Sequence, residues 1–127
     1  MTKPIPLQYG HYYHIYNRGT NGENIFIEER NYHHFLRLYT RYISPIADTF
    51  AYCLLRNHFH LSVRIKTLDE LVAQLKAAMK PTMKTIKMLT PSQHFSNFFN
   101  AYAKAINAAY GLNVDLVCCV GQMEVLE

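Results

Sequence analysis

The chain has 127 residues, half of them apolar and 17% charged, which is the composition of one globular domain and excludes a low-complexity or disordered chain. No apolar run is long enough to cross a bilayer, and the first ten residues lack the pattern of a secretory signal. We therefore expect a single domain over residues 1–127 in a cytoplasmic protein without a membrane partner.

The net charge of +4 is distributed unevenly along the chain. Residues 1–104 hold all thirteen Lys and Arg against six acids, which is +7, whereas residues 105–127 hold three acids and no Lys or Arg, which is −3. A basic surface attracts a polyanion, because each neutralised phosphate releases counterions. The charge alone is a weak indication of a nucleic-acid partner.

The first elements are a predicted strand and a predicted helix. Residues 11–18 are rich in β-forming aromatic residues and end at Gly19, which is typical of a strand followed by a turn. Apolar residues then recur at helical spacing over residues 32–43, and Pro45 closes that segment. A helix is expected there.

A β-hairpin is predicted next. Residues 49–55 and 58–65 are two β-rich runs that only Arg56 and Asn57 separate, a spacing that suits a tight antiparallel turn.

Two more helices are predicted in the second half of the chain. Thr67 and Glu70 have the spacing of a capping box ahead of an apolar helical stripe that ends before Pro81. A linker with Lys84 and Lys87 follows, either solvated or facing phosphate. Ser92 is then expected to cap a third helix.

That third helix has one apolar face and should end at Gly111, and residues 114–120 can add a fourth strand. The order β-α-β-β-α, then a helix and a strand, predicts an α+β fold with a ferredoxin-like antiparallel sheet covered by helices. Many functions use this fold, so it decides little about activity.

Two histidines, His58 and His60, stand at the start of the second hairpin strand. Side chains two residues apart on a strand project from the same face, so both imidazoles can converge on one ion while Phe59 points into the core. Imidazole suits Mn²⁺ or Zn²⁺ better than Mg²⁺, although phosphate and carboxylate or amide oxygens can complete a site for a harder ion. The pattern indicates a metal site; the alternative is a half-exposed strand with two unrelated histidines.

Several segments in this order resemble the REP-associated tyrosine transposases and, more broadly, the single-tyrosine HUH transposases of insertion sequences. The resemblance covers about residues 9–111, and its segments are 13–19, 24–26, 32–38, 51–55, 57–61 and 95–111. It implies an enzyme that nicks single-stranded DNA beside hairpins. His58 and His60 would hold a divalent ion, Mg²⁺ or Mn²⁺, that polarises the scissile phosphate, while a tyrosine hydroxyl attacks to leave a 5′-phosphotyrosine and a free 3′-hydroxyl. A homodimer is one of the oligomeric states seen among such relatives.

The chain departs from this family after Gly111. The relatives carry the nucleophilic tyrosine on a later helix, in a Tyr-Ile-x-x-Asn-Pro-like context after a Gly-x-Leu-aromatic-Gln-like strand, and this chain has neither. We therefore expect an atypical or truncated end from about residue 112. Tyr102 and Tyr110 are the nearest substitutes, but Tyr102 falls on an apolar helix face, where packing is the expected role. The nucleophile stays unknown.

Asn17 and Arg18, at the end of the first strand, are candidate DNA contacts, because a guanidinium pairs well with phosphate. The main hypothesis is a transposase-family protein that binds single-stranded or hairpin DNA and a divalent metal. One alternative is a non-catalytic nucleic-acid-binding module derived from such a transposase. Another is a metal-dependent hydrolase unrelated to DNA.

Overall fold

A computed structural model describes residues 6–81, 88–116 and 119–122 of the chain, with side chains up to residue 116. The basic part of the expected linker, with Lys84 and Lys87, lies outside these residues. Within them, no helix is both long and apolar enough to cross a membrane.

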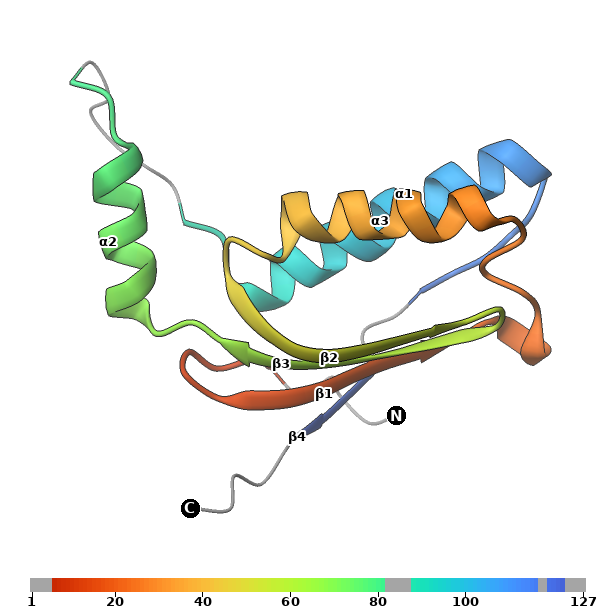
Figure 1. Ribbon diagram of the computed structural model, residues 1–127, viewed down its shortest axis with the longest axis horizontal. Coiled ribbons are helices and arrows are strands. Elements are labelled where there is room, and N and C mark those ends of the chain that lie inside the picture. The colour runs from red at the N-terminus through yellow and green to blue at the C-terminus, as the bar shows by residue number, and fades with distance from the viewer. Residues whose placement is uncertain (1–5, 82–87, 117–118, 123–127) are drawn as a thin grey trace.

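A four-stranded antiparallel sheet forms one layer of the molecule, and two helices form the other (Figure 1). The strand order is β2-β3-β1-β4. The strands are β1 (Tyr12–Arg18), β2 (Ala47–Leu55), β3 (His58–Ile65) and β4 (Cys119–Gln122). The helices are η1 (Thr20–Gly22), α1 (Glu29–Tyr42), α2 (Leu68–Ala78) and α3 (Pro91–Tyr110).

Helices α1 and α3 lie side by side on one face of the sheet, and α2 stands beyond the end of β3 (Figure 1). The chain leaves β1 through α1 and returns on β2, two places away, with β3 between them. The second crossover likewise connects β3 to β4 with β1 between them. This split arrangement is the ferredoxin-like α+β fold that the sequence predicts.

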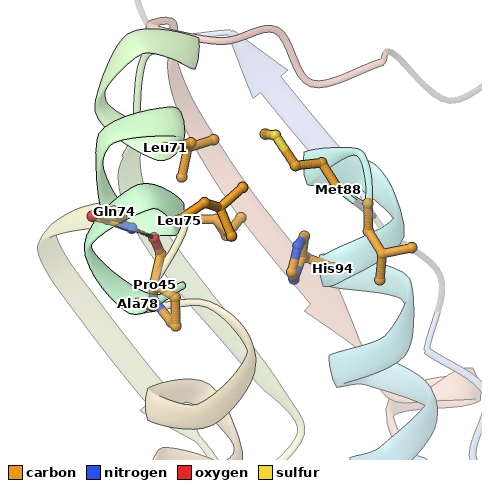
Figure 2. A pocket seen from close by; sticks show the side chains of 9 residues that line it. Pro45, Leu71, Gln74, Leu75, Ala78, Met88 and His94 are labelled. Atoms are coloured by element: carbon orange, nitrogen blue, oxygen red, sulfur yellow. Dashed lines mark hydrogen bonds between the residues drawn. The ribbon is translucent and has the colours of Figure 1, made fainter. Parts of the chain in front are cut away.

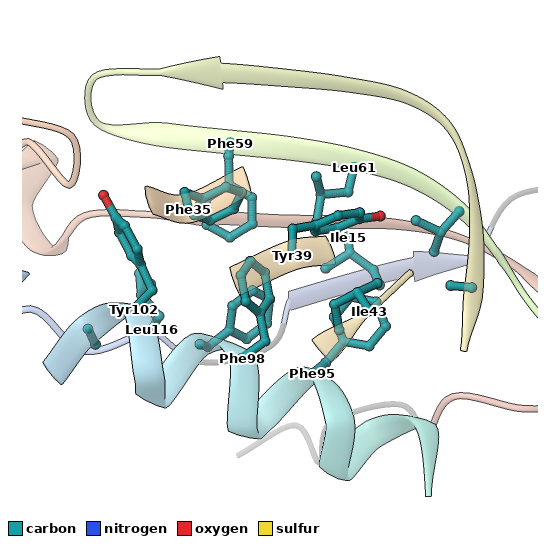
Figure 3. Packing of buried hydrophobic residues seen from close by; sticks show 14 of the residues in the cluster. Ile15, Phe35, Tyr39, Ile43, Phe59, Leu61, Phe95, Phe98, Tyr102 and Leu116 are labelled. Atoms are coloured by element: carbon teal, nitrogen blue, oxygen red, sulfur yellow. The ribbon is translucent and has the colours of Figure 1, made fainter. Parts of the chain in front are cut away.

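Strict alternation along β3 places the core on one face of the sheet. Phe59, Leu61, Val63 and Ile65 are buried beneath the helices. Helices α1 and α3 supply aromatic rings above them, and the Phe35 ring centre lies 5.0 Å from that of Phe59 (Figure 3). The other β3 side chains, including His58 and His60, therefore project from the opposite face, which none of the described helices covers.

The helix starts agree with the sequence in one case and correct it in another. Thr67 and Glu70 form the predicted capping box at α2, where Thr67 Oγ1 accepts from the Glu70 backbone N–H at 3.2 Å. The expected cap of α3, Ser92, was wrong. Thr90 caps α3, because Pro91 takes the first helical position, where its missing N–H costs nothing. Ser92 Oγ instead accepts from the backbone N–H of Leu7 at 3.1 Å.

The fourth strand exists but begins later than the expected Val114. The Asn107 side chain donates to the Val114 carbonyl at 2.9 Å and accepts from its N–H at 2.8 Å, so this backbone is already satisfied without a neighbouring strand. Val114 and Leu116 are buried in the core rather than placed on a sheet edge. The ladder with β1 starts at Cys119, which pairs with Tyr16.

Candidate functional site

Five side chains from two neighbouring strands share the sheet face that lies opposite the helices. Arg18 on β1 pairs with His58 on β3, and Tyr16 pairs with His60. Directly paired residues of an antiparallel ladder project from the same face, and His14 joins them two residues before Tyr16. We call His14, Tyr16, Arg18, His58 and His60 the histidine face.

The two predicted histidines lie close together. The ring centres of His58 and His60 are 5.2 Å apart, with the planes almost perpendicular at 87°. The Nδ1 of His58 is 2.7 Å from Oδ1 of Asn57, and the Nδ1 of His60 is 2.8 Å from Nε2 of His14. Tyr16 stacks beside His60 at 6.1 Å between ring centres. All four rings thus form one continuous cluster on the sheet.

Two imidazoles on one sheet face can supply part of the ligand set of a divalent cation. Both imidazoles line a pocket of 390 Å³, together with Tyr16, Asn17 and Arg18. Among the described residues, no hydrogen-bond partner contacts the Nε2 atom of His58 or of His60. The described part of the chain contains no group of three or more His, Cys, Asp or Glu placed to hold a metal. A cation on this face would need ligands beyond the two imidazoles, and water or a bound phosphate can supply them.

The two predicted DNA contacts lie on different faces of β1. Arg18 is exposed on the histidine face beside His58, where its guanidinium can reach a phosphate. Asn17 pairs with Phe59 and is only 6% exposed, and its Oδ1 accepts from the Arg18 backbone N–H at 2.9 Å. The structure therefore brings Arg18 to the histidines, while Asn17 lines the same pocket from a buried position at the strand end.

Sequence reasoning missed three neighbours of the histidine pair, namely His14, Tyr16 and Asn57. The sequence alone does not join His14 to the pair, because its spacing from His58 and His60 matches no ligand motif. The period of two along residues 12–18 carried the missing signal, since it places His14, Tyr16 and Arg18 on one side of β1. Only the pairing of β1 with β3 shows that this side meets His60.

Tyr102 lies in the core, on the helix side of the sheet (Figure 3). Its hydroxyl donates to the Ile25 carbonyl at 2.6 Å, and burial raises its pKa well above the usual value. The packing role expected from its apolar helix face is confirmed. The Tyr110 hydroxyl contacts the side chains of Glu28 and Asn31 at the start of α1. Neither hydroxyl faces the histidine pair.

A second pocket, of 340 Å³, lies between α2 and the N-terminal end of α3 (Figure 2). Its walls are mainly apolar, with Leu71, Leu75 and Met88 among them. His94 points into it, and burial lowers the pKa of that imidazole. Among the described residues that line it, His94 is the one titratable group, so they offer less chemistry than the histidine face.

The comparisons with known proteins bear on the fold. The sequence matches no protein-family model and no curated protein. Among solved structures, the chain is similar to a REP-associated tyrosine transposase bound to a REP hairpin, with a TM-score of 0.58. The match covers 99% of this chain and 63% of that one, so this chain spans less than two thirds of the other's length. At 11% sequence identity, the likeness shows a shared fold and a distant structural relationship.

The loop after β1 forms hydrogen bonds with the turn between β2 and β3, which directly precedes His58. The Gly19 N–H donates to the Asn57 carbonyl at 2.8 Å, and the N–H groups of Ile25 and Phe26 both donate to the Arg56 carbonyl. A side chain at Gly19 is excluded, because its Cβ would lie 2.0 Å from the Glu23 carbonyl oxygen. The turn before His58 is thereby fixed to the end of β1.

Gly19→Ala should therefore destabilise the fold by about 1–3 kcal/mol, because backbone must move to admit the methyl group. It should also shift the His58 resonances. Gly22→Ala is the matched control, since nothing lies within 4 Å of its added Cβ and only its positive φ of 74° is strained. Denaturant unfolding and side-chain NMR measure both effects. Equal losses of unfolding free energy in the two variants, with unchanged His58 resonances, would contradict this role of the loop.

Proposed function

We propose that the histidine face binds single-stranded, hairpin-forming DNA together with a divalent cation, Mn²⁺ or Mg²⁺, held by His58 and His60. The observation that supports this most strongly is the convergence of two imidazoles, an exposed arginine and an exposed tyrosine on one sheet face that none of the described helices covers. A cation bound there would polarise an adjacent phosphate oxygen. The solved structure of similar fold holds a REP hairpin, which agrees with a DNA partner.

Each side chain of the face has a distinct role in this proposal. Arg18 pairs with a phosphate through its guanidinium, which also steers the strand toward the histidines. Tyr16 is 42% exposed and offers its ring for stacking on an unpaired base. The scissile or bound phosphate then lies over His58 and His60, where it supplies oxygen ligands in addition to the two imidazoles.

In the transposase hypothesis, a tyrosine hydroxyl attacks the phosphate, so that a 5′-phosphotyrosine bond forms while the bond to the 3′ oxygen breaks and leaves a free 3′-hydroxyl on the DNA. The alternative is a non-catalytic binding module that uses the same face without cutting. The second view is favoured by Tyr102 and Tyr110, whose hydroxyls are both engaged away from the face. A hydrolase unrelated to DNA is the third reading, and a preference for hairpin oligonucleotides over small phosphoesters would exclude it.

Replacing His58 or His60 with Ala should weaken Mn²⁺ binding by more than about tenfold, because one of the two proposed imidazole ligands is lost. Calorimetry on the purified protein measures this. His33→Ala is the control, since His33 is an exposed histidine on α1, in the other layer. Unchanged affinity in both strand variants, or an equal loss in the control, would end the metal-site proposal.

Hairpin DNA should bind with a marked salt dependence, weakening by more than about tenfold between roughly 50 and 200 mM NaCl as counterions are recaptured. Arg18→Ala should reduce the slope of log K against log salt by about one phosphate contact. Arg37→Ala removes the same charge from an exposed position on α1 and should leave the slope unchanged. A larger reduction of this slope by Arg37→Ala than by Arg18→Ala would indicate that DNA binds the helix layer instead.

The chain should form no covalent DNA adduct with a labelled hairpin oligonucleotide and Mn²⁺, because the Tyr102 and Tyr110 hydroxyls are engaged away from the histidine pair and Tyr16 is assigned to base stacking, which leaves only slow attack by water. Denaturing gel electrophoresis detects such an adduct directly. Tyr16→Phe and Tyr102→Phe identify the attacking residue if one forms. An adduct lost in either variant would show that the chain is a complete nicking enzyme and would refute the non-catalytic reading.

A further inference from the structure

The Nδ1 atoms of His58 and His60 each contact a side chain outside the pair. His58 Nδ1 lies 2.7 Å from Asn57 Oδ1, and His60 Nδ1 lies 2.8 Å from His14 Nε2. Both rings are therefore held at the same nitrogen by a neighbour outside the pair. This inference rests on the proposed metal site, and it concerns how the two ligands are prepared for it.

The contact to His58 has only one chemical direction. An amide oxygen accepts and cannot donate, so the proton of the neutral His58 ring must sit on Nδ1. The lone pair is then on Nε2, for which no hydrogen-bond partner exists among the described residues. Asn57 thus sets the tautomer of His58 as well as its ring orientation. The backbone of Asn57 is itself held in place, since its main-chain carbonyl accepts a hydrogen bond from the Gly19 N–H.

The contact to His60 has two directions, with opposite consequences. If His60 Nδ1–H donates to His14 Nε2, the His60 Nε2 atom carries the lone pair and can ligate a cation. If His14 donates instead, His60 carries its proton on Nε2 and cannot ligate through that atom. Ligating histidines in proteins commonly donate their other N–H to an acceptor in this way.

We propose that His14 and Asn57 are positioning residues, which accept the Nδ1 protons of His60 and His58 and so leave both Nε2 lone pairs for one divalent cation. Three features support this. The two contacts engage the same ring nitrogen of each histidine. Both histidines line one pocket. His14 sits on the histidine face through the β1–β3 pairing, from 46 residues away in the chain.

The test separates an acceptor from a mere space-filler. His14→Gln keeps an amide oxygen near His60, whereas His14→Leu removes every acceptor; Asn57→Asp and Asn57→Leu make the same comparison at His58. Long-range ¹H–¹⁵N spectra of the metal-free protein report which ring nitrogen carries the proton, and Mn²⁺ titration by calorimetry reports affinity. Melting temperatures confirm that each variant is folded.

The wild-type protein should show both histidines protonated on Nδ1. His14→Leu should shift His60, and Asn57→Leu should shift His58, toward the tautomer with the proton on Nε2. Each should also weaken Mn²⁺ binding by about tenfold or more. His14→Gln and Asn57→Asp should keep most of the wild-type tautomer and most of the Mn²⁺ affinity. Because Asn57 lies in the hairpin turn, its variants give a second reading if His14→Leu does not fold. Wild-type tautomers and affinity in the folded Leu variants would overturn the positioning role alone. Absence of Mn²⁺ binding in the wild-type protein would overturn the metal site itself.

Discussion

The alternation of apolar and polar residues along β3 is the constraint on which the rest of the molecule depends. Phe59, Leu61, Val63 and Ile65 are all buried, and burying such a side chain stabilises the fold by roughly 1.5–3 kcal/mol. A slip of one residue in register would expose all four and bury His58 and His60 in the core instead. The free energy of the core thus fixes the position of the histidines, whose own contacts are individually worth far less.

A second constraint acts at the hairpin turn. The segment after β1 donates three backbone hydrogen bonds to the carbonyls of Arg56 and Asn57, and the Tyr102 hydroxyl of α3 binds the Ile25 carbonyl in the same segment. The turn directly before His58 is therefore held by the end of β1, by the loop that follows it and, through that loop, by α3. This rigidity suits a site whose two ligands come from neighbouring positions of one strand.

Most of the fold could be predicted from local patterns, because helical spacing, β-rich runs and the Thr67 capping box each involve residues that are close together in the sequence. The start of β4 could not, since Asn107 satisfies the Val114 backbone from another element. His58 and His60 were found through their spacing of two. His14 was not, because its contact with His60 arises from pairing between β1 and β3, and a single sequence does not record which strands become neighbours.

Cation and DNA should share the histidine face, which carries His14, Tyr16, Arg18, His58 and His60. Paramagnetic broadening by Mn²⁺, recorded by NMR on the complex with a hairpin oligonucleotide, tests it most directly. Broadening should centre on His58 and His60, spread to β1, and spare α1 and α3, while the oligonucleotide shifts resonances of the same strands. Broadening centred on the helix layer, or DNA shifts confined to that layer, would contradict the account.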